Sequence, residues 1–176
     1  LTVSGSPSAG AITLSGGGTG TGDTIDINAD VTTAGALTIQ NAATVDLAAN
    51  VDLSGGSVAA NSNVGAINLS GAGTNLVSGT AGSVNLGPVT DGAVVANLTV
   101  SATTDVTLAA VTMDGGGALS ATADSDNNST STLALNGVVS ATGVTLSGGG
   151  TGTLDTIDVN ADVSATTGAL TIQNAG

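Results

Sequence analysis

Hydrophobic residues recur along this chain in short units, in which two aliphatic side chains flank a polar one. Leu1-Thr2-Val3 and Ile12-Thr13-Leu14 open the series, and similar triplets follow through the rest of the sequence. A spacing of two between apolar residues is typical of a β-strand with one buried face, because successive side chains of a strand point to opposite sides. The polar member of each triplet, usually Thr, Asp or Asn, is expected to face solvent.

Clusters of Gly, Ser, Asn and Asp separate the triplets and predict turns, as at Ser15-Gly16-Gly17-Gly18. Strands this short bury too few side chains to be stable as isolated hairpins. They become stable when coils of chain stack, so that each strand pairs with the coils above and below it. The sequence therefore predicts an all-β fold, a parallel β-helix (β-solenoid). An immunoglobulin-like sandwich is less favoured, because it uses longer strands and an aromatic core.

A long internal repeat organises the chain. Residues 12–31 (ITLSGGGTGTGDTIDINADV) recur almost unchanged at 144–163 (VTLSGGGTGTLDTIDVNADV), so that Ile12 corresponds to Val144 with an offset of 132 residues. After one inserted residue the match resumes with ALTIQNA, at 36–42 and again at 169–175.

This repeat sets the expected domain organisation. Residues 1–132 form one long repeat of a continuous solenoid, residues 133–176 form the first third of the next, and no separate globular domain is expected. The pattern also predicts a tandem array that continues beyond both ends. At roughly 20 residues per coil and about 4.8 Å between coils, the chain would make about nine coils.

The amino-acid composition excludes several classes of function. The chain has no Lys, Arg or His, and its 13 acidic residues, all Asp, give a formal net charge of -13. Nucleic acid is not an expected partner, because phosphate binding needs Lys or Arg. No apolar run is long enough to form a transmembrane segment.

Catalytic side chains are almost absent as well. Proton transfer and nucleophile activation usually draw on His, Lys, Cys, Glu or Tyr, and of the catalytic types only Asp, Ser and Thr occur here. A pair of Asp carboxylates could cleave glycosides, but such sites normally add aromatic platforms and cations. We therefore expect no enzymatic activity.

Two stretches are candidate calcium sites. Asp124, Asp126 and Asn128 place oxygen atoms at positions 1, 3 and 5 of a calcium loop. Ser129 replaces the glycine expected at position 6, and Leu135 replaces the final Glu. The alternative is a polar loop that bulges from the solenoid.

The Gly-rich stretch 17–25 resembles a calcium-binding nonapeptide, with its Asp one position late. This makes Asp23 and Asp26, and their counterparts Asp155 and Asp158, candidate metal ligands; an ordinary turn before a strand is the alternative. Calcium would also relieve repulsion among stacked carboxylates, so weak binding along the Asp-bearing faces is expected. No cofactor is required, and calcium is the one candidate ion.

Thr19-Gly20-Thr21 and Thr151-Gly152-Thr153 each place two Thr on one face, as in flat ice-binding solenoids. Ice binding would need such a pair on every coil, and only these two are in clear register. The other outward positions are an irregular mix of Thr, Asp, Asn and Ala, which favours a structural role over a binding face.

The stretches ALTIQNA, LTVSATTDVTL and VTLSGGGTGT resemble the repeat regions of filamentous-haemagglutinin-type adhesins and autotransporter passengers of bacteria. This resemblance implies a right-handed parallel β-helix shaft that is exported and assembled outside the cell, without functional residues of its own. We therefore expect an extracellular or cell-surface structural shaft or filament segment. Its expected partners are copies of itself or adjoining repeats. The alternative is a binding module that uses a solenoid face for calcium, a glycan or ice.

Overall fold

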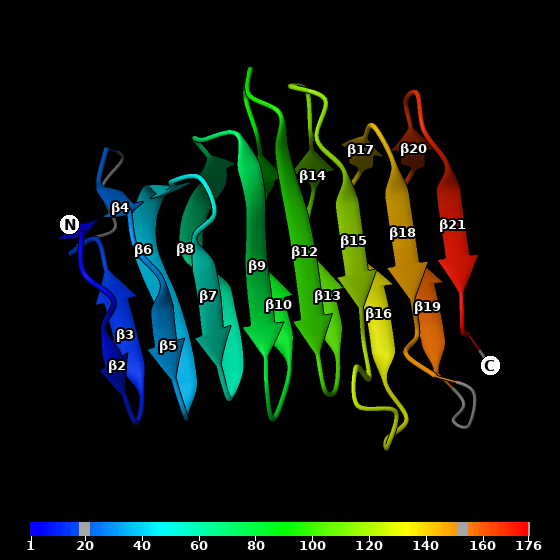
Figure 1. The fold of residues 1–176 in the computed structure, drawn as a ribbon, viewed down its shortest axis with the longest axis horizontal. Coiled ribbons are helices and arrows are strands. Elements are labelled where there is room, and N and C mark those ends of the chain that lie inside the picture. The colour runs from blue at the N-terminus through cyan, green and yellow to red at the C-terminus, as the bar shows by residue number, and fades with distance from the viewer. Residues whose placement is uncertain (18–21, 151–154, 176) are drawn as a thin grey trace.

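The computed structural model describes residues 1–17, 22–150 and 155–175, and every regular element in them is a β-strand. The chain winds as a parallel β-helix whose coils stack from the N-terminus to the C-terminus (Figure 1). Every pairing between strands is parallel and joins one coil to the next, for example β10 to β13 and β12 to β15. This confirms the fold predicted from the triplets.

The strands form three faces, named here in chain order. Face 1 contains β1 (Thr2–Val3), β4 (Thr24–Ile27), the C-terminal parts of β6 (Ala36–Leu47) and β8 (Ser57–Leu69), β11 (Val89–Thr90), β14 (Val111–Thr112), β17 (Val139–Ala141) and β20 (Val163–Ala165). Face 2 contains β2 (Ser8–Ala9), β5 (Val31–Thr33), β7 (Asp52–Gly55), β9 (Gly73–Gly79), β12 (Ala96–Ala102), β15 (Leu119–Thr122), β18 (Val144–Ser147) and β21 (Leu170–Gln173). Face 3 contains β3 (Ile12–Ser15), the N-terminal parts of β6 and β8, β10 (Val84–Leu86), β13 (Val106–Leu108), β16 (Thr132–Leu135) and β19 (Thr156–Val159).

The coiling is right-handed, as expected for parallel crossovers of L-residues. In Figure 1 the strands of face 2 run downward in front, and the chain rises again behind them while it advances from N to C. One turn takes from 20 residues, between the paired Asp26 and Asp46, to 28, between the paired Thr112 and Ser140. The turns are longer than the assumed 20 residues, so the chain makes about seven turns and the expectation of nine was wrong.

Two strands, β6 and β8, continue across the corner between face 3 and face 1 and join these faces into one sheet. At the corner, Asn41 and Asn63 adopt positive φ angles of 54°, a left-handed conformation that Asn tolerates better than most residues. Their side chains stack, with Asn63 Nδ2 donating to Asn41 Oδ1 at 3.1 Å. The strand can therefore bend without losing its pairing to the next coil.

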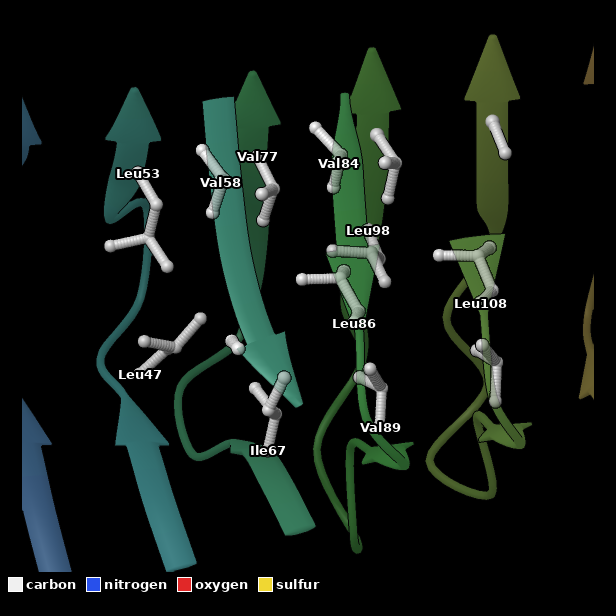
Figure 2. Close-up of a cluster of buried hydrophobic side chains, with 14 of the residues drawn as sticks. Leu47, Leu53, Val58, Ile67, Val77, Val84, Leu86, Val89, Leu98 and Leu108 are labelled. Atoms are coloured by element: carbon white, nitrogen blue, oxygen red, sulfur yellow. The ribbon is translucent and has the colours of Figure 1, made fainter. Parts of the chain in front are cut away.

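The core is a set of aliphatic rows that run along the solenoid axis. Figure 2 shows the side chains of consecutive coils, such as Val58 and Val84, pointing into the space between the faces. Leu86, Leu108 and Leu135 lie in register on face 3 and are 2% exposed or less. Aliphatic side chains of the last turn remain exposed, namely Val159, Leu170 and Ile172.

The two copies of the repeated sequence lie on different faces. Ile12–Ser15 forms β3 on face 3, whereas the matching Val144–Ser147 forms β18 on face 2. Face 3 takes five turns to pass from β3 to β16, and β18 follows two faces later. One repeat therefore spans five turns and two of the three faces. The second copy is displaced by two-thirds of a turn along the chain, which is the same as a rotation of one-third of a turn in the opposite direction.

Local structure is nevertheless the same in both copies. Gly16 N donates to Gln40 O at 3.2 Å, and the equivalent Gly148 N donates to Gln173 O at 3.2 Å. Asn174 has a φ of 56°, close to that of its counterpart Asn41. The sequence thus determines strand, turn and pairing, while the face depends on the number of strands that came before.

We expect Leu108→Ala to destabilise the fold by about 2–5 kcal/mol, because it leaves a cavity in a fully packed aliphatic row. Urea unfolding followed by circular dichroism measures the change. Thr107→Ala is the control, since Thr107 lies on the outer side of the same strand. Equal losses for the two variants would contradict the assignment of inner and outer positions.

Candidate functional site

The predicted calcium loop is the polar segment between β15 and β16, in the longest turn of the solenoid. Asp124 is fully buried, while Asp126 and Asn128 are exposed. Asp124 Oδ1 accepts hydrogen bonds from Asn128 N at 3.1 Å and Ser129 N at 3.2 Å. Asn128 Nδ2 donates to Asp126 Oδ2 at 2.6 Å. The three side chains are near one another, but Asp124 turns inward and binds the backbone of its own loop.

This environment shifts the ionisation of Asp124. Burial by itself raises the pKa of the carboxyl group, because it penalises the charged form. The hydrogen bonds from Asn128 N, Ser129 N and the Ser129 hydroxyl stabilise the carboxylate and outweigh burial, so the pKa lies below its ordinary value of 3.8. Asp124 therefore stays charged at neutral pH and acts as a clamp on the loop.

The other four candidate ligands do not form one site. Asp23 and Asp26 belong to the first copy and lie at or on β4 of face 1, whereas Asp155 and Asp158 belong to the second and lie at or on β19 of face 3. Asp155 is buried and its Oδ1 accepts from Ser131 N at 3.0 Å, while Asp158 is exposed. Within residues 1–17, 22–150 and 155–175, no group of three acidic side chains is arranged to hold a metal ion. Calcium binding at these residues remains a prediction.

Buried acidic and amide side chains serve instead as acceptors for backbone N–H groups of the neighbouring coil. Asp91 is 1% exposed, and its two oxygens accept from Gly115 N at 2.9 Å and Gly117 N at 3.4 Å. Asn75 replaces an aliphatic residue in an inner row of face 2, and its Oδ1 accepts from Val51 N at 2.8 Å. These contacts satisfy backbone donors at turns where the regular pairing is interrupted.

Two half-buried carboxylates lie side by side on face 1. Asp26 and Asp46 are in register on adjacent strands, so their side chains project from neighbouring positions about 4.8 Å apart along the axis. Each accepts one hydrogen bond, Asp46 from Asn68 Nδ2 at 2.8 Å and Asp26 from the Thr2 hydroxyl at 3.2 Å. With no Lys or Arg in the chain, only these neutral donors compensate the two charges.

Sequence reasoning missed a groove on face 2. Its volume is about 450 Å³, and it runs across β9, β12, β15, β18 and β21. One side carries a row of hydroxyls, one from each of four successive strands: Thr99, Ser120, Thr145 and Thr171. Small residues in register beside this row, Ala118, Gly143 and Ala169, leave the surface hollow.

A second hydroxyl row runs parallel to the first on face 2, through Ser54, Ser78, Ser101, Thr122 and Ser147. The expectation that outward positions are irregular is therefore wrong for these hydroxyl rows, but it holds at the N-terminal end of the face, where Asp52 and Leu76 precede Thr99 in the first row. On face 1 the outward row changes along the axis: it passes through Asp26, Asp46 and Asn68 and then continues as the hydroxyls of Thr90, Thr112, Ser140 and Ser164. The sequence shows that Thr99 and Thr145 are the polar members of their triplets, but only the strand register shows that their hydroxyls align. The Thr-Gly-Thr motifs at 19–21 and 151–153 lie outside the described residues.

The part of the chain that the structure describes contains no helix long and apolar enough to cross a membrane. Comparison with protein-family models, curated proteins and solved structures finds no match for this chain.

Acidification is expected to release the Asp124 clamp. Because its pKa is lowered in the folded protein, the carboxylate contributes stability that is fully present above pH 3.8 and is lost as the pH falls through the lower folded-state value. The NMR signals of the Asn128 and Ser129 amides should therefore titrate below pH 3.8, and Asp124→Asn should abolish this transition. An inflection above pH 3.8 at these amides would contradict the assigned role.

We expect Asp46→Asn to stabilise the protein by about 0.2–1 kcal/mol, because it removes a like charge beside Asp26 and keeps an acceptor for Asn68. Chemical unfolding at low and high salt measures the effect, which should shrink as salt screens the repulsion. Asp158→Asn is the matched control, since Asp158 pairs with Ala134 and has no acidic neighbour in register. A gain of the same size at Asp158 would rule out the repulsion.

Proposed function

We propose that this chain is a shaft or filament-forming segment of an extracellular, cell-surface protein and that it carries out no catalysis. The observation that carries the proposal is the uninterrupted stack of parallel coils, in which each strand pairs only with the coils before and after it. Such a solenoid is quasi-one-dimensional, and its length grows with the number of coils while its cross-section stays constant. This geometry suits a stiff spacer.

The chemistry of the chain supports the same role. Within the described residues, the buried polar groups Asp91, Asp124 and Asp155 are used to hold turns. The rotation of the second repeat by one-third of a turn means that repeated sequence would not line up on one side of a longer array. Equivalent surface positions of successive repeats would therefore face different sides of the array, which does not affect a shaft.

Edge strands suggest how such segments associate. The last turn described presents β19, β20 and β21 with one unpaired edge each, and Val159, Leu170 and Ile172 are 43–53% exposed beside them. Unpaired edges with exposed aliphatic side chains favour pairing with another strand. We propose that they meet an adjoining repeat or a second copy of the chain, stacked head to tail.

Electron microscopy of the isolated 176-residue chain tests the proposal. We expect thin rods that lengthen with concentration, and Leu170→Lys with Ile172→Lys should stop this growth by placing charges at the stacking edge. Thr171→Lys with Gln173→Lys is the control, because it adds the same two charges to the same strand at its outward positions, away from Leu170 and Ile172.

Each outcome has a meaning. Compact particles at all concentrations would contradict filament formation, and rods that grow equally well in the double variant would contradict the edge as the contact. Repeating the measurement with calcium tests the weak calcium binding expected along the Asp-bearing faces, which would relieve repulsion between carboxylates and give longer or more regular rods.

A further inference from the structure

The hydroxyl row in the groove of face 2 is not used by the fold. Among the described residues, the hydroxyls of Thr99, Ser120, Thr145 and Thr171 make no hydrogen bond to another protein group. Other hydroxyls at coil corners do; Thr80 and Thr166, for example, donate to backbone carbonyls of the preceding coil. Four donors and acceptors therefore remain open to a ligand, one on each successive strand.

The shape of the groove restricts that ligand to a narrow, extended chain. The row is perpendicular to the strands and repeats at the strand spacing of about 4.8 Å. Ala118 and Gly143 form the hollow beside it. At the N-terminal end of the row, Leu76 stands in place of a residue with a hydroxyl. Beside the row, the side-chain oxygen of Asn97 already accepts a hydrogen bond from Ala118 N at 2.9 Å. A ligand would lie along the solenoid axis and meet one hydroxyl per strand.

The charge of the groove and of the whole chain further restricts the kind of ligand. No charged residue lines the groove, and the chain as a whole carries -13 without a single Lys or Arg. A polyanion would be repelled by this field, and a cation would find no counter-charge in the groove. The ligand that fits is uncharged and rich in groups that both donate and accept hydrogen bonds.

We propose that this groove binds a linear, uncharged polysaccharide, with about one sugar ring on each strand. An extended chain of β-1,4-linked pyranose rings advances at each ring by slightly more than the strand spacing of about 4.8 Å and turns alternate rings over. Hydroxyls from alternate edges of successive rings would therefore meet Thr99, Ser120, Thr145 and Thr171. An ice surface is less well matched, because the floor at Ala118 and Gly143 is recessed from the hydroxyls. This binding site is independent of the proposed shaft, since it uses the side of the solenoid and leaves its edges free.

The test is an NMR titration of the ¹⁵N-labelled chain with cellohexaose and with chitohexaose. We expect shift changes confined to β12, β15, β18 and β21, with Thr145→Val weakening binding about three- to tenfold through the loss of one hydrogen bond. Valine has nearly the shape of threonine and favours strands, so the fold is retained. Gly143→Val should fill the hollow and abolish binding; a Cβ at this position makes only an ordinary contact, 3.7 Å from Ala169 O.

The repeat supplies a matched control. Thr13 occupies the position equivalent to Thr145 in the first copy, in the triplet ITL instead of VTL, but it lies on face 3. There the row passes from Thr13 and Thr38 to Ala59, which has no hydroxyl. Thr13→Val should therefore leave binding unchanged.

Three results would overturn the proposal. These are no shift changes with either oligosaccharide at millimolar concentration, equal weakening by Thr13→Val and Thr145→Val, or ice shaping that depends on Thr145 in the absence of sugar binding. Rod formation in the microscope is scored separately, so a failure of the groove and a failure of the shaft can be distinguished.

Discussion

Parallel hydrogen bonding between each coil and the next is the interaction on which the rest of this structure depends. Most strands have only two to four residues, and none is stable by itself. Pairing satisfies their backbone groups and at the same time brings the aliphatic side chains of consecutive coils into contact. Backbone satisfaction and core formation are therefore one event, repeated at every turn.

The same pairing places every outward side chain beside its counterpart on the next coil, so the outward side chains of successive coils form rows along the axis. On face 1 this brings Asp26 next to Asp46, an arrangement that the chain tolerates through donors from Thr2 and Asn68. On face 2 it aligns hydroxyls into rows, which neither attract nor repel one another strongly. Stacking thus produces both the repulsion between neighbouring carboxylates on face 1 and the regular rows of hydroxyls on face 2.

A chain without cations has to manage its carboxylates in other ways. Asp91 and Asp124 are buried and accept several hydrogen bonds from the backbone, which stabilises the charge without an ion pair. Both lie at turns, where the ladder of parallel strands is interrupted and N–H groups need acceptors. The abundance of Asp and Asn therefore has a structural explanation that does not depend on a metal.

Local order was encoded in the sequence alone. The triplets predicted the strands and their buried faces, and Gly- and Asn-rich clusters predicted the turns, because alternation and turn chemistry act within a few residues. The internal repeat also predicted matching local structures, as the equivalent contacts of Gly16 and Gly148 show.

Only the tertiary structure decided which residues become neighbours across coils. A turn takes between 20 and 28 residues, and one extra strand moves all that follows to another face. For this reason the sequence could not place the second repeat on face 2, bury Asp155, or align Thr99 with Ser120, Thr145 and Thr171. Strand formation is a short-range property, whereas register is the sum of all preceding turn lengths, and that sum is fixed only when the coils pack.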